Sequence, residues 1–412
     1  MPATDPAVVA RVAALVARAR AAQHVADGYD QARTDELVLA AGWSIMEPGR
    51  NRALAELAVA DTGIGRVDDK IAKNHRKTLG LLRDLQGARS VGVIREDAAA
   101  GLVEIARPVG VVCAVTPSTN PAATPINKII NALKGRNAVI VAPSPKGWST
   151  AQRLVEMVWA QFDRIGAPRD LVQVLPAPID KAHTGELMRQ CDLVVATGSQ
   201  ANVRAAYASG TPAFGVGAGN VAAIVDETAD VAAAAARIAR SKTFDNATSC
   251  SSENSVVVVA SQRVALLQAL AAHGAVLLVA ADKARLQTLM WPDGKLSSRA
   301  IGQGAEAIAA GAGIGVPAGT RMLMVDEDGV GAAHPFSGEK LSPVLALYTV
   351  PDFAAAAACV AAVYAFQGAG HSVSLHTTRD ERALQLGLTL PVSRVIVNQA
   401  HAIATGGSFD NG

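Results

Sequence analysis

Hydrophobic and polar positions follow two different patterns along the chain. Up to about residue 90, Ala, Leu and Val recur at three- and four-residue spacing with charged residues between them, which is typical of amphipathic helices. The first helix is predicted within residues 1–22, and its apolar face comprises Val8, Val9, Val12, Leu15 and Val16. From Val109 onward, short continuous apolar runs alternate with segments of helical periodicity. This alternation predicts parallel sheets covered by helices, the α/β class.

The apolar runs fall into two series, which predict two α/β units. Strands of the first series are predicted at Val109–Val115, Asn137–Ala142, Leu171–Leu175, Asp192–Thr197 and Val221–Val225, with helices at Thr124–Lys134, Thr150–Ile165 and Ala201–Ser209. The second series has helices at Val231–Lys242 and Arg263–His273 and strands at Ser255–Ala260, Ala275–Val279, Arg321–Val325, Leu345–Val350, Ser372–Thr377 and Arg394–Val397. We therefore predict a domain over residues 1–225, a second over 226–400, and a polar, Gly-rich tail over 401–412.

Composition excludes several classes of protein. Half of the 412 residues are hydrophobic and 18% are charged, which argues against intrinsic disorder. The 38 Lys and Arg residues balance 36 Asp and Glu residues without a basic block, so nucleic-acid binding is not expected. Apolar stretches such as Val264–Ala280 are interrupted before they reach membrane-spanning length, and no secretory signal is apparent. We expect a cytoplasmic protein that binds no membrane and keeps its thiols reduced.

One of the four cysteines differs from the others in its surroundings. Cys113, Cys191 and Cys359 lie in or beside apolar runs and are interpreted as small buried side chains. Cys250 lies in the polar loop Thr243–Glu253, between a predicted helix and a predicted strand. A nucleophilic thiol needs partial exposure and polar neighbours, which this loop provides. Its context alone fits a catalytic cysteine and an inert loop cysteine equally well.

Neither a metal site nor a standard dinucleotide fingerprint is predicted. The eight histidines form no metal-binding pattern, and His371 and His376 are expected on opposite faces of a strand. His371 follows a Gly-containing turn, where it fits either an acid–base role or a solvated position. Gly215–Asn220 resembles a nucleotide-binding fingerprint only weakly, since no strand clearly precedes it and no helix starts on it. A dinucleotide would therefore bind here in an atypical way.

Several motifs occur in the order of a known family. They are Asp61–Gly65, Asp68–His75, Thr116–Pro121, Asn137–Lys146, Ala196–Ser199, Gly215–Asn220, Lys242–Glu253 and Glu339–Pro343. With them the chain resembles coenzyme A-acylating aldehyde dehydrogenases, including the aldehyde-dehydrogenase half of bifunctional aldehyde–alcohol dehydrogenases and the acylating sulfoacetaldehyde dehydrogenases. The resemblance implies an aldehyde dehydrogenase-like fold, with a Rossmann-type NAD(P)-binding domain and an α/β catalytic domain. Relatives continue for some tens of residues beyond the position of Gly412, which puts the C-terminal closure and part of a subunit interface in question.

The resemblance also implies the roles of individual residues. Cys250 attacks the aldehyde to form a thiohemiacetal, hydride passes to the nicotinamide, and a thioester remains on the enzyme. Asn120 and the backbone N–H of Cys250 stabilise the oxyanion, and His371 deprotonates the incoming thiol. Glu339 holds the nicotinamide ribose, unless it is only a solvated surface glutamate. The remaining nucleotide-binding positions are Thr116, Pro117, Ser118, Ser144, Pro145, Lys146, Thr197, Gly198, Ser199 and Gly217.

An absent carboxylate favours acyl transfer to coenzyme A. Hydrolytic aldehyde dehydrogenases carry, in the stretch corresponding to Gly215–Asn220, a glutamate that activates water, and this stretch has none. Without a positioned base, water attacks a thioester slowly, so a thiol must release the acyl group. The alternatives are a hydrolytic enzyme that makes a free acid and a catalytically silent scaffold subunit.

The sequence allows more than one nicotinamide cofactor and more than one aldehyde substrate. The segment Ala142–Gly147 contains Lys146 and no acid, so NADP is as acceptable as NAD, although Lys146 fits an exposed loop lysine equally well. The substrate expected from the family is a small aldehyde such as acetaldehyde. The Ser- and Thr-rich loops Thr116–Asn120 and Ala247–Ser252 indicate a polar pocket, and the resemblance to acylating sulfoacetaldehyde dehydrogenases adds sulfoacetaldehyde. The resemblance implies a homodimer or homotetramer.

Overall fold

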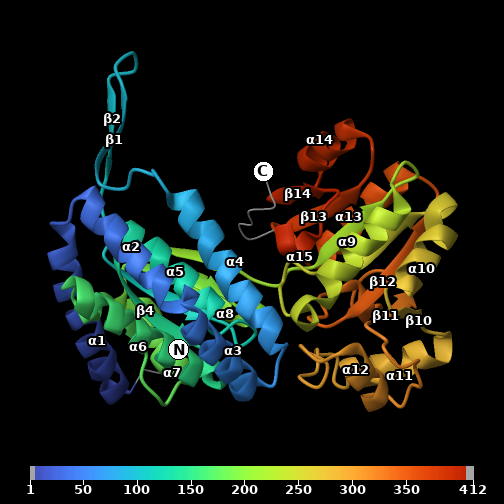
Figure 1. Cartoon of the computed structure of the whole chain (residues 1–412), viewed down its shortest axis with the longest axis horizontal. Coiled ribbons are helices and arrows are strands. Elements are labelled where there is room, and N and C mark those ends of the chain that lie inside the picture. Colours follow the sequence, from blue (N-terminus) through green and yellow to red (C-terminus); the bar gives the residue numbers. More distant parts are fainter. Residues whose placement is uncertain (1–4, 405–412) are drawn as a thin grey trace. The chain divides into compact units, whose positions relative to one another are not determined.

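The computed structural model describes residues 5–404, which form two compact units (Figure 1). The first unit comprises residues up to Gly63 and Lys70–Gly217, and the second comprises Ile64–Asp69 and the residues from Ala218 onward. The predicted tail is described only as far as Ala404, and residues 405–412 lie outside the described part. No helix within residues 5–404 has both the length and the apolar character required to cross a membrane.

The first unit contains four N-terminal helices, a hairpin and a five-stranded sheet with its covering helices. In chain order its elements are α1 (Pro6–Asp27), α2 (Gln31–Met46), α3 (Pro48–Thr62), α4 (Val67–Leu85), β1 (Gly92–Asp97), β2 (Leu102–Ala106), β3 (Val111–Thr116), α5 (Ala123–Lys134), β4 (Ala138–Pro143), α6 (Trp148–Ile165), β5 (Val172–Val174), α7 (Lys181–Gln190), β6 (Leu193–Thr197), α8 (Gln200–Tyr207) and β7 (Ala213–Val216). The first three residues of α4 cluster with the second unit.

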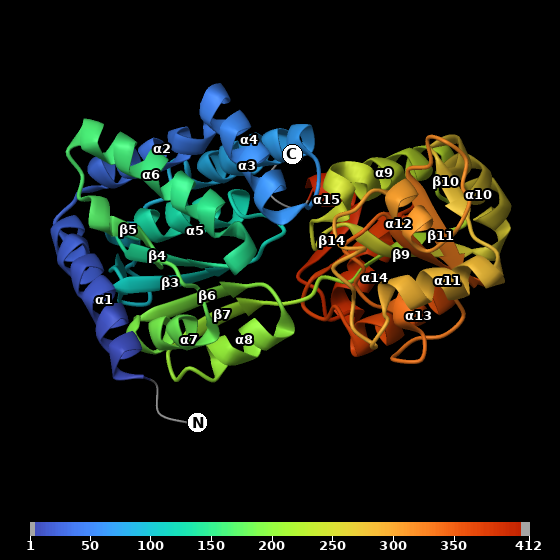
Figure 2. The same ribbon diagram turned by 90° about the horizontal axis from the view of Figure 1, so that it is seen from below.

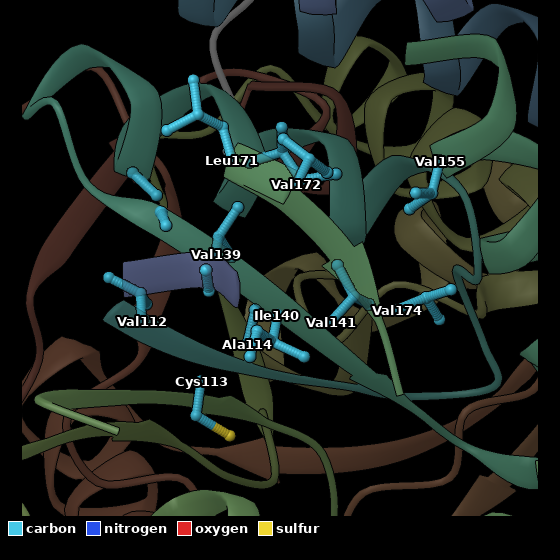
Figure 3. Packing of buried hydrophobic residues seen from close by; sticks show 14 of the residues in the cluster. Val112, Cys113, Ala114, Val139, Ile140, Val141, Val155, Leu171, Val172 and Val174 are labelled. Carbon is cyan, nitrogen blue, oxygen red and sulfur yellow. The ribbon is translucent and has the colours of Figure 1, made fainter. Parts of the chain in front are cut away.

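The five-stranded sheet confirms the Rossmann-type prediction. All neighbouring strands are parallel, in the order β5-β4-β3-β6-β7. Helices α5 and α6 cover one face and α7 and α8 the other (Figure 2). The central strands β3 and β4 are buried at every position, which explains their unbroken apolar sequence (Figure 3). The strand order reverses between β3 and β6, and ligands of open α/β sheets bind at the carboxyl ends of strands beside such a reversal.

Two elements of this unit were not predicted from the sequence. The antiparallel hairpin β1–β2 projects from the unit (Figure 1) and exposes Leu102, Val103 and Ile105. Its strands lack the apolar alternation of a half-buried sheet, because neither face packs on the core of the unit. The short edge strand β7 includes Gly215, which the sequence placed in a loop without a preceding strand.

The second unit is built around a seven-stranded sheet. Its elements are β8 (Val221–Val225), α9 (Val231–Thr243), β9 (Glu253–Val259), α10 (Arg263–Ala272), β10 (Ala275–Leu277), α11 (Ala280–Met290), α12 (Ala305–Gly311), β11 (Met322–Asp326), β12 (Val344–Val350), α13 (Phe353–Phe366), β13 (Ser372–His376), α14 (Asp380–Thr389), β14 (Arg394–Val397) and α15 (His401–Ala404). Short 3₁₀ turns occur in the two units at Pro145–Gly147, Arg169–Leu171, Phe244–Ala247, Ala260–Gln262 and Pro335–Ser337.

The second sheet is entirely parallel, in the order β10-β11-β12-β9-β8-β13-β14. Helices α9 and α10 cover one face, and α11 and α13 cover the other (Figure 2). Strand β8 is hydrogen-bonded between β9 and β13, so Val221–Val225 belongs to this sheet and not to the first domain, where the sequence had placed it. The division between the units therefore precedes β8, at Gly217/Ala218, rather than following residue 225. An apolar run alone does not reveal which sheet a strand joins.

Candidate active site

Four polar segments of the second unit meet at one edge of its sheet. Gly219 and Asn220 precede β8, Cys250 precedes β9, Glu339 precedes β12, and His371 precedes β13. These four strands are adjacent and parallel, so their amino ends lie along the same edge. Segments separated by up to about 150 residues in the sequence are thereby brought together around one thiol.

The loop before Cys250 has an unusual backbone. Residues 245–247 have φ angles of 51°, 50° and 58°, in the left-handed region that non-glycine residues rarely occupy. Such a conformation costs of order 1–3 kcal/mol per residue and persists where contacts enforce it. The Asp245 N–H donates to the Asp69 carboxylate (2.9 Å), and the Asp245 carboxylate accepts from the Arg66 N–H (2.8 Å). The start of α4 and the residue before it therefore hold the loop that carries Cys250.

Cys250 has a histidine partner. Its Sγ lies 3.4 Å from Nε2 of His371, and both side chains are partly exposed. The other ring nitrogen, Nδ1, lies 2.7 Å from Oγ of Ser372, whose side chain is buried. Nucleophile, base and orienting group thus follow one another within hydrogen-bonding distance, as in other activated nucleophiles. This geometry supports the catalytic interpretation of Cys250 and His371, which stays a prediction.

Gly219 lies against the backbone of Cys250. An ideal Cβ added at Gly219 would lie 2.3 Å from the carbonyl oxygen of Cys250 and 2.8 Å from its Cβ, so only glycine fits. The Gly219 N–H donates to Oε1 of Glu339 (3.0 Å), and its carbonyl accepts from Nδ2 of Asn254 (3.1 Å). Asn254 also accepts the Lys340 N–H (2.9 Å), which ties the segments around the thiol together.

Glu339 is not the solvated surface glutamate that the sequence allowed. It is partly buried, and burial raises the pKa of its carboxyl to about 7 against the opposing effects of the Gly219 N–H and two lysines. The sequence also indicated that Gly215–Asn220 lacks a carboxylate of its own. The structure brings the Glu339 carboxylate to this stretch, where the Gly219 N–H occupies one of its oxygens.

A cluster of buried charges lies behind this region. Lys242 and Lys340 are fully buried, and desolvation lowers the pKa of Lys242 to about 7 and that of Lys340 well below its ordinary value. Burial raises the pKa of Glu253 to about 7, against a hydrogen bond from Ser241. Attraction between Lys242 and the carboxyls of Glu253 and Glu339 opposes these shifts. Burial therefore lowers the pKa of the lysines and raises that of the carboxyls, so both shifts disfavour the charged forms.

In the first unit, the predicted nucleotide-binding residues lie at the carboxyl edge of the sheet. Thr116 ends β3 and Thr197 ends β6, with Pro117–Ser118 and Gly198–Ser199 directly after them. Ser144–Lys146 follow β4, and Gly217 follows β7. These segments flank the reversal of strand order, where a dinucleotide is expected. Thr116 Oγ1 is buried and has no hydrogen-bond partner among residues 5–404, so this edge fits a polar ligand.

Helix α8 adds to this fit, since Ser199 caps it and its N-terminal N–H groups point to the same edge. Pro145 and Lys146 are exposed, so Lys146 is available to a bound phosphate. No helix begins at Gly217, as expected from the sequence.

Asn120 lies in the same unit, after β3. Its Oδ1 accepts a hydrogen bond from Nζ of Lys73 on α4 (2.9 Å), and its Nδ2 lies 3.3 Å from Oγ1 of Thr119. The structure therefore groups Cys250, His371 and Glu339 in the second unit and Asn120 with the nucleotide positions in the first.

The other cysteines fit inert roles. Cys113 and Cys191 are buried, and burial with the neighbouring Cys113 thiol raises the pKa of Cys191. Cys359 is only partly buried, contrary to the interpretation of a fully buried side chain, because α13 presents it toward an edge of the apolar cluster. Burial still raises the pKa of its thiol to about 11, which leaves it protonated and unreactive at neutral pH.

One group of possible metal ligands is present among the described residues. Glu327, Asp328 and His334 have ligand atoms within 4.8 Å of one another. Nζ of Lys283 lies 3.1 Å from the Glu327 carboxylate, so this carboxylate already has a cationic partner. The group is explained as an ion-pair cluster.

Sequence reasoning missed Lys73, Ser372 and Asn254. Lys73 lies within the Asp68–His75 motif, and Ser372 directly follows His371, so both were adjacent to residues already singled out. The position beside a candidate base was the available signal for Ser372. No signal marked Asn254, whose role depends on contacts between distant segments.

Comparison with known proteins agrees with this geometry. Residues 4–292 match the model of the aldehyde dehydrogenase family. The acylating sulfoacetaldehyde dehydrogenase of Cupriavidus necator is 66% identical over 403 residues, which cover 97% of this chain and 82% of that protein. The acetylating aldehyde dehydrogenase of Geobacillus thermoglucosidasius superposes with a TM-score of 0.92 at 34% identity, covering 97% of this chain and 88% of that one.

A propionaldehyde dehydrogenase of Rhodopseudomonas palustris, solved with bound CoA and an acylated cysteine, superposes with a TM-score of 0.86. It is 26% identical, and the match covers 96% of this chain and 90% of that one. Together with the extent of the family match, these similarities place the chain in the aldehyde dehydrogenase family, among its coenzyme A-acylating members.

Proposed function

We propose that this enzyme oxidises sulfoacetaldehyde with NAD(P)⁺ on Cys250 and transfers the acyl group to coenzyme A. The observation that carries the proposal is the 3.4 Å approach of His371 Nε2 to Cys250 Sγ, in a loop that packs against the sterically constrained Gly219. The choice of sulfoacetaldehyde over acetaldehyde rests on the acylating sulfoacetaldehyde dehydrogenase at 66% identity.

The residues of the chain account for each proton and each bond. His371 accepts the Cys250 proton, the thiolate adds to the aldehyde carbon, and Asn120 is the proposed donor to the resulting oxyanion. NAD(P)⁺ supplies the hydride acceptor, and loss of hydride from the thiohemiacetal leaves a thioester on Cys250. His371 passes the Cys250 proton to solvent before coenzyme A reacts. Coenzyme A then attacks the thioester carbonyl while His371 takes the proton of its thiol, and the Cys250 thiolate leaves and recovers a proton from His371.

We propose that the nucleotide lies along the carboxyl edge of the first sheet and that Glu339 is also a nucleotide-binding residue. The exposed Lys146 and the absence of an acid in Ala142–Gly147 support acceptance of NADP as well as NAD.

We also propose a homodimer or homotetramer. The hairpin β1–β2 supports it, because Leu102, Val103 and Ile105 are between 57% and 61% exposed on an element that makes no core contacts of its own. Size-exclusion chromatography with light scattering tests this proposal, and a monomer at micromolar concentration would contradict it.

The reaction is tested by following NAD(P)H formation with sulfoacetaldehyde, acetaldehyde, propionaldehyde and succinate semialdehyde, each with either nicotinamide nucleotide. We expect turnover to need coenzyme A, to be highest with sulfoacetaldehyde and to vanish in Cys250→Ser, while that variant remains folded. Steady turnover without coenzyme A would instead indicate hydrolysis. Equal rates across the panel would refute the substrate assignment.

A further inference from the structure

Two buried lysines of α4 hold the loop that carries Asn120. Lys70 and Lys73 are 3% and 2% exposed, and they are one helical turn apart, so both face the same way. Lys70 Nζ donates to the carbonyl of Thr119 (3.2 Å), and Lys73 Nζ donates to Oδ1 of Asn120 (2.9 Å). Lys70 therefore holds the backbone of this loop, and Lys73 holds the side chain of Asn120.

The Lys73 contact decides which way the Asn120 amide faces. An ammonium group has three donors and no acceptor, so it can meet only the oxygen of the amide and never its NH₂ group. A flipped amide would place the NH₂ hydrogens against the ammonium hydrogens and lose the bond. The amide nitrogen of Asn120 is therefore held on the side away from Lys73.

The surroundings strengthen this contact. Lys70, Lys73, Asn74 and Asn120 line a small cavity of about 10 Å³, roughly the space of one water molecule, and both lysines are buried. Solvent therefore screens the Lys73 charge little. A hydrogen bond to a charged donor is about twice as strong as a neutral one, and a cation on Oδ1 withdraws electron density from the amide and makes Nδ2–H a stronger donor.

We propose that Lys73 is a positioning residue for the reaction, which holds and polarises the Asn120 amide so that Nδ2 donates to the oxyanion of the thiohemiacetal. This inference rests on the proposed function, since it requires Asn120 to serve the oxyanion. In this proposal Lys73 acts through Asn120 and not on the reacting atoms. Its effect is expected on the rate of the chemical step and not on the reactivity of the thiol.

The test compares single-turnover hydride transfer, read as NAD(P)H formation, in Lys73→Met, Lys73→Gln, Lys73→Arg, Asn120→Ala and the double variant Lys73→Met/Asn120→Ala. We expect Lys73→Met to slow this step about 10- to 100-fold with little change in the KM for aldehyde. Lys73→Arg should restore most of the rate because it keeps the charge and the donors. Loss of an oxyanion donor costs about 10²–10³-fold, so Asn120→Ala should be slower still.

The decisive result is whether the rate losses caused by the Lys73 and Asn120 substitutions add in the double variant. If Lys73 acts through Asn120, the double variant will match Asn120→Ala within about threefold. A wild-type rate in Lys73→Met or in Asn120→Ala would overturn the inference, as would a double variant whose loss is the product of the two single losses. Lys73→Gln provides the same comparison if Lys73→Met does not fold, since it retains a hydrogen bond without the charge.

Two control experiments distinguish a wrong role for Lys73 from a general loss of activity and from a wrong proposed function. Lys134→Met removes another buried lysine of the same unit, which pairs with Asp35, and should keep the wild-type rate. Alkylation of Cys250 by iodoacetamide forms no oxyanion and should be unchanged in Lys73→Met. Acyl-CoA formation by Cys250→Ser would refute the proposed function itself, whereas an inactive Cys250→Ser with a fully active Lys73→Met would refute only the role of Lys73.

Discussion

Replacing Gly219 by alanine should disable the enzyme without unfolding it. A Cβ at this position would lie 2.3 Å from the Cys250 carbonyl oxygen and 2.9 Å from its carbonyl carbon, whereas ordinary contacts begin near 3.4 Å. Because the obstacle is backbone, the segment before β8 that contains Gly219 and the Cys250 loop must separate by roughly 1 Å. A displacement of this size at a reacting group costs about 10²-fold in rate. Overpacking of this kind costs about 1–3 kcal/mol in the free energy of unfolding.

The assay is coenzyme A-dependent NAD(P)H formation, with stability measured by urea unfolding. We expect kcat of Gly219→Ala to fall about 100-fold while the variant remains folded. Gly315→Ala is the matched control, since a Cβ there meets nothing within 4 Å, and it should keep full activity. A Gly219→Ala enzyme with wild-type kcat would refute the argument that this glycine sets the position of Cys250.

Three further predictions concern the same unit. Ser372→Ala should loosen the ring of His371, and so lower the rate of acyl transfer to coenzyme A about tenfold and alter its pH profile. Ser374→Ala is the control and should change neither, since Ser374 lies on the same face of β13 and its hydroxyl has no hydrogen-bond partner in the described chain. Because the Glu339 carboxyl ionises near pH 7, the Kd for NAD(P)⁺ measured by calorimetry should fall about tenfold between pH 6 and pH 8, and Glu339→Gln should abolish this dependence. Burial lowers the pKa of His376 to about 4, so the unfolded chain takes up a proton below pH 6.5 while the folded chain does not. Proton uptake by His376 in the unfolded chain should therefore lower the free energy of unfolding by about 2.5 kcal/mol between pH 7 and pH 4.5, and the drop measured in urea titrations of His376→Leu should be smaller by about that amount.

Much of the fold was predictable because its strands are buried on both faces. Fully buried parallel strands such as β3, β4 and β8 appear as continuous apolar runs, and the helices between them show regular periodicity. The sheet to which β8 belongs was not predictable, since pairing between strands is decided by packing over long sequence distances. The hairpin β1–β2 carries no core-facing pattern that the sequence could reveal.

The principal residues of the candidate site were largely predictable from the sequence, whereas the hydrogen bonds between them were not. The polar loop around Cys250 stands out in an apolar chain, and family resemblance supplied His371 and Glu339. The contacts of Lys73 and Ser372 depend on three-dimensional geometry: one joins a helix to a distant loop, and the other requires a particular orientation of the histidine ring. Lys73 contacts Asn120 and Ser372 contacts His371, so neither residue could be recognised as functional from its type alone.

The central claim is that Cys250 carries the acyl group between oxidation and transfer. Intact-protein and peptide mass spectrometry tests it directly, after the enzyme is incubated with sulfoacetaldehyde and NAD(P)⁺ in the absence of coenzyme A. We expect one adduct per chain with the mass of the sulfoacetyl group, located on Cys250 and lost when coenzyme A is added. An adduct on another residue, or an unmodified Cys250 in an enzyme that turns over with coenzyme A, would contradict it.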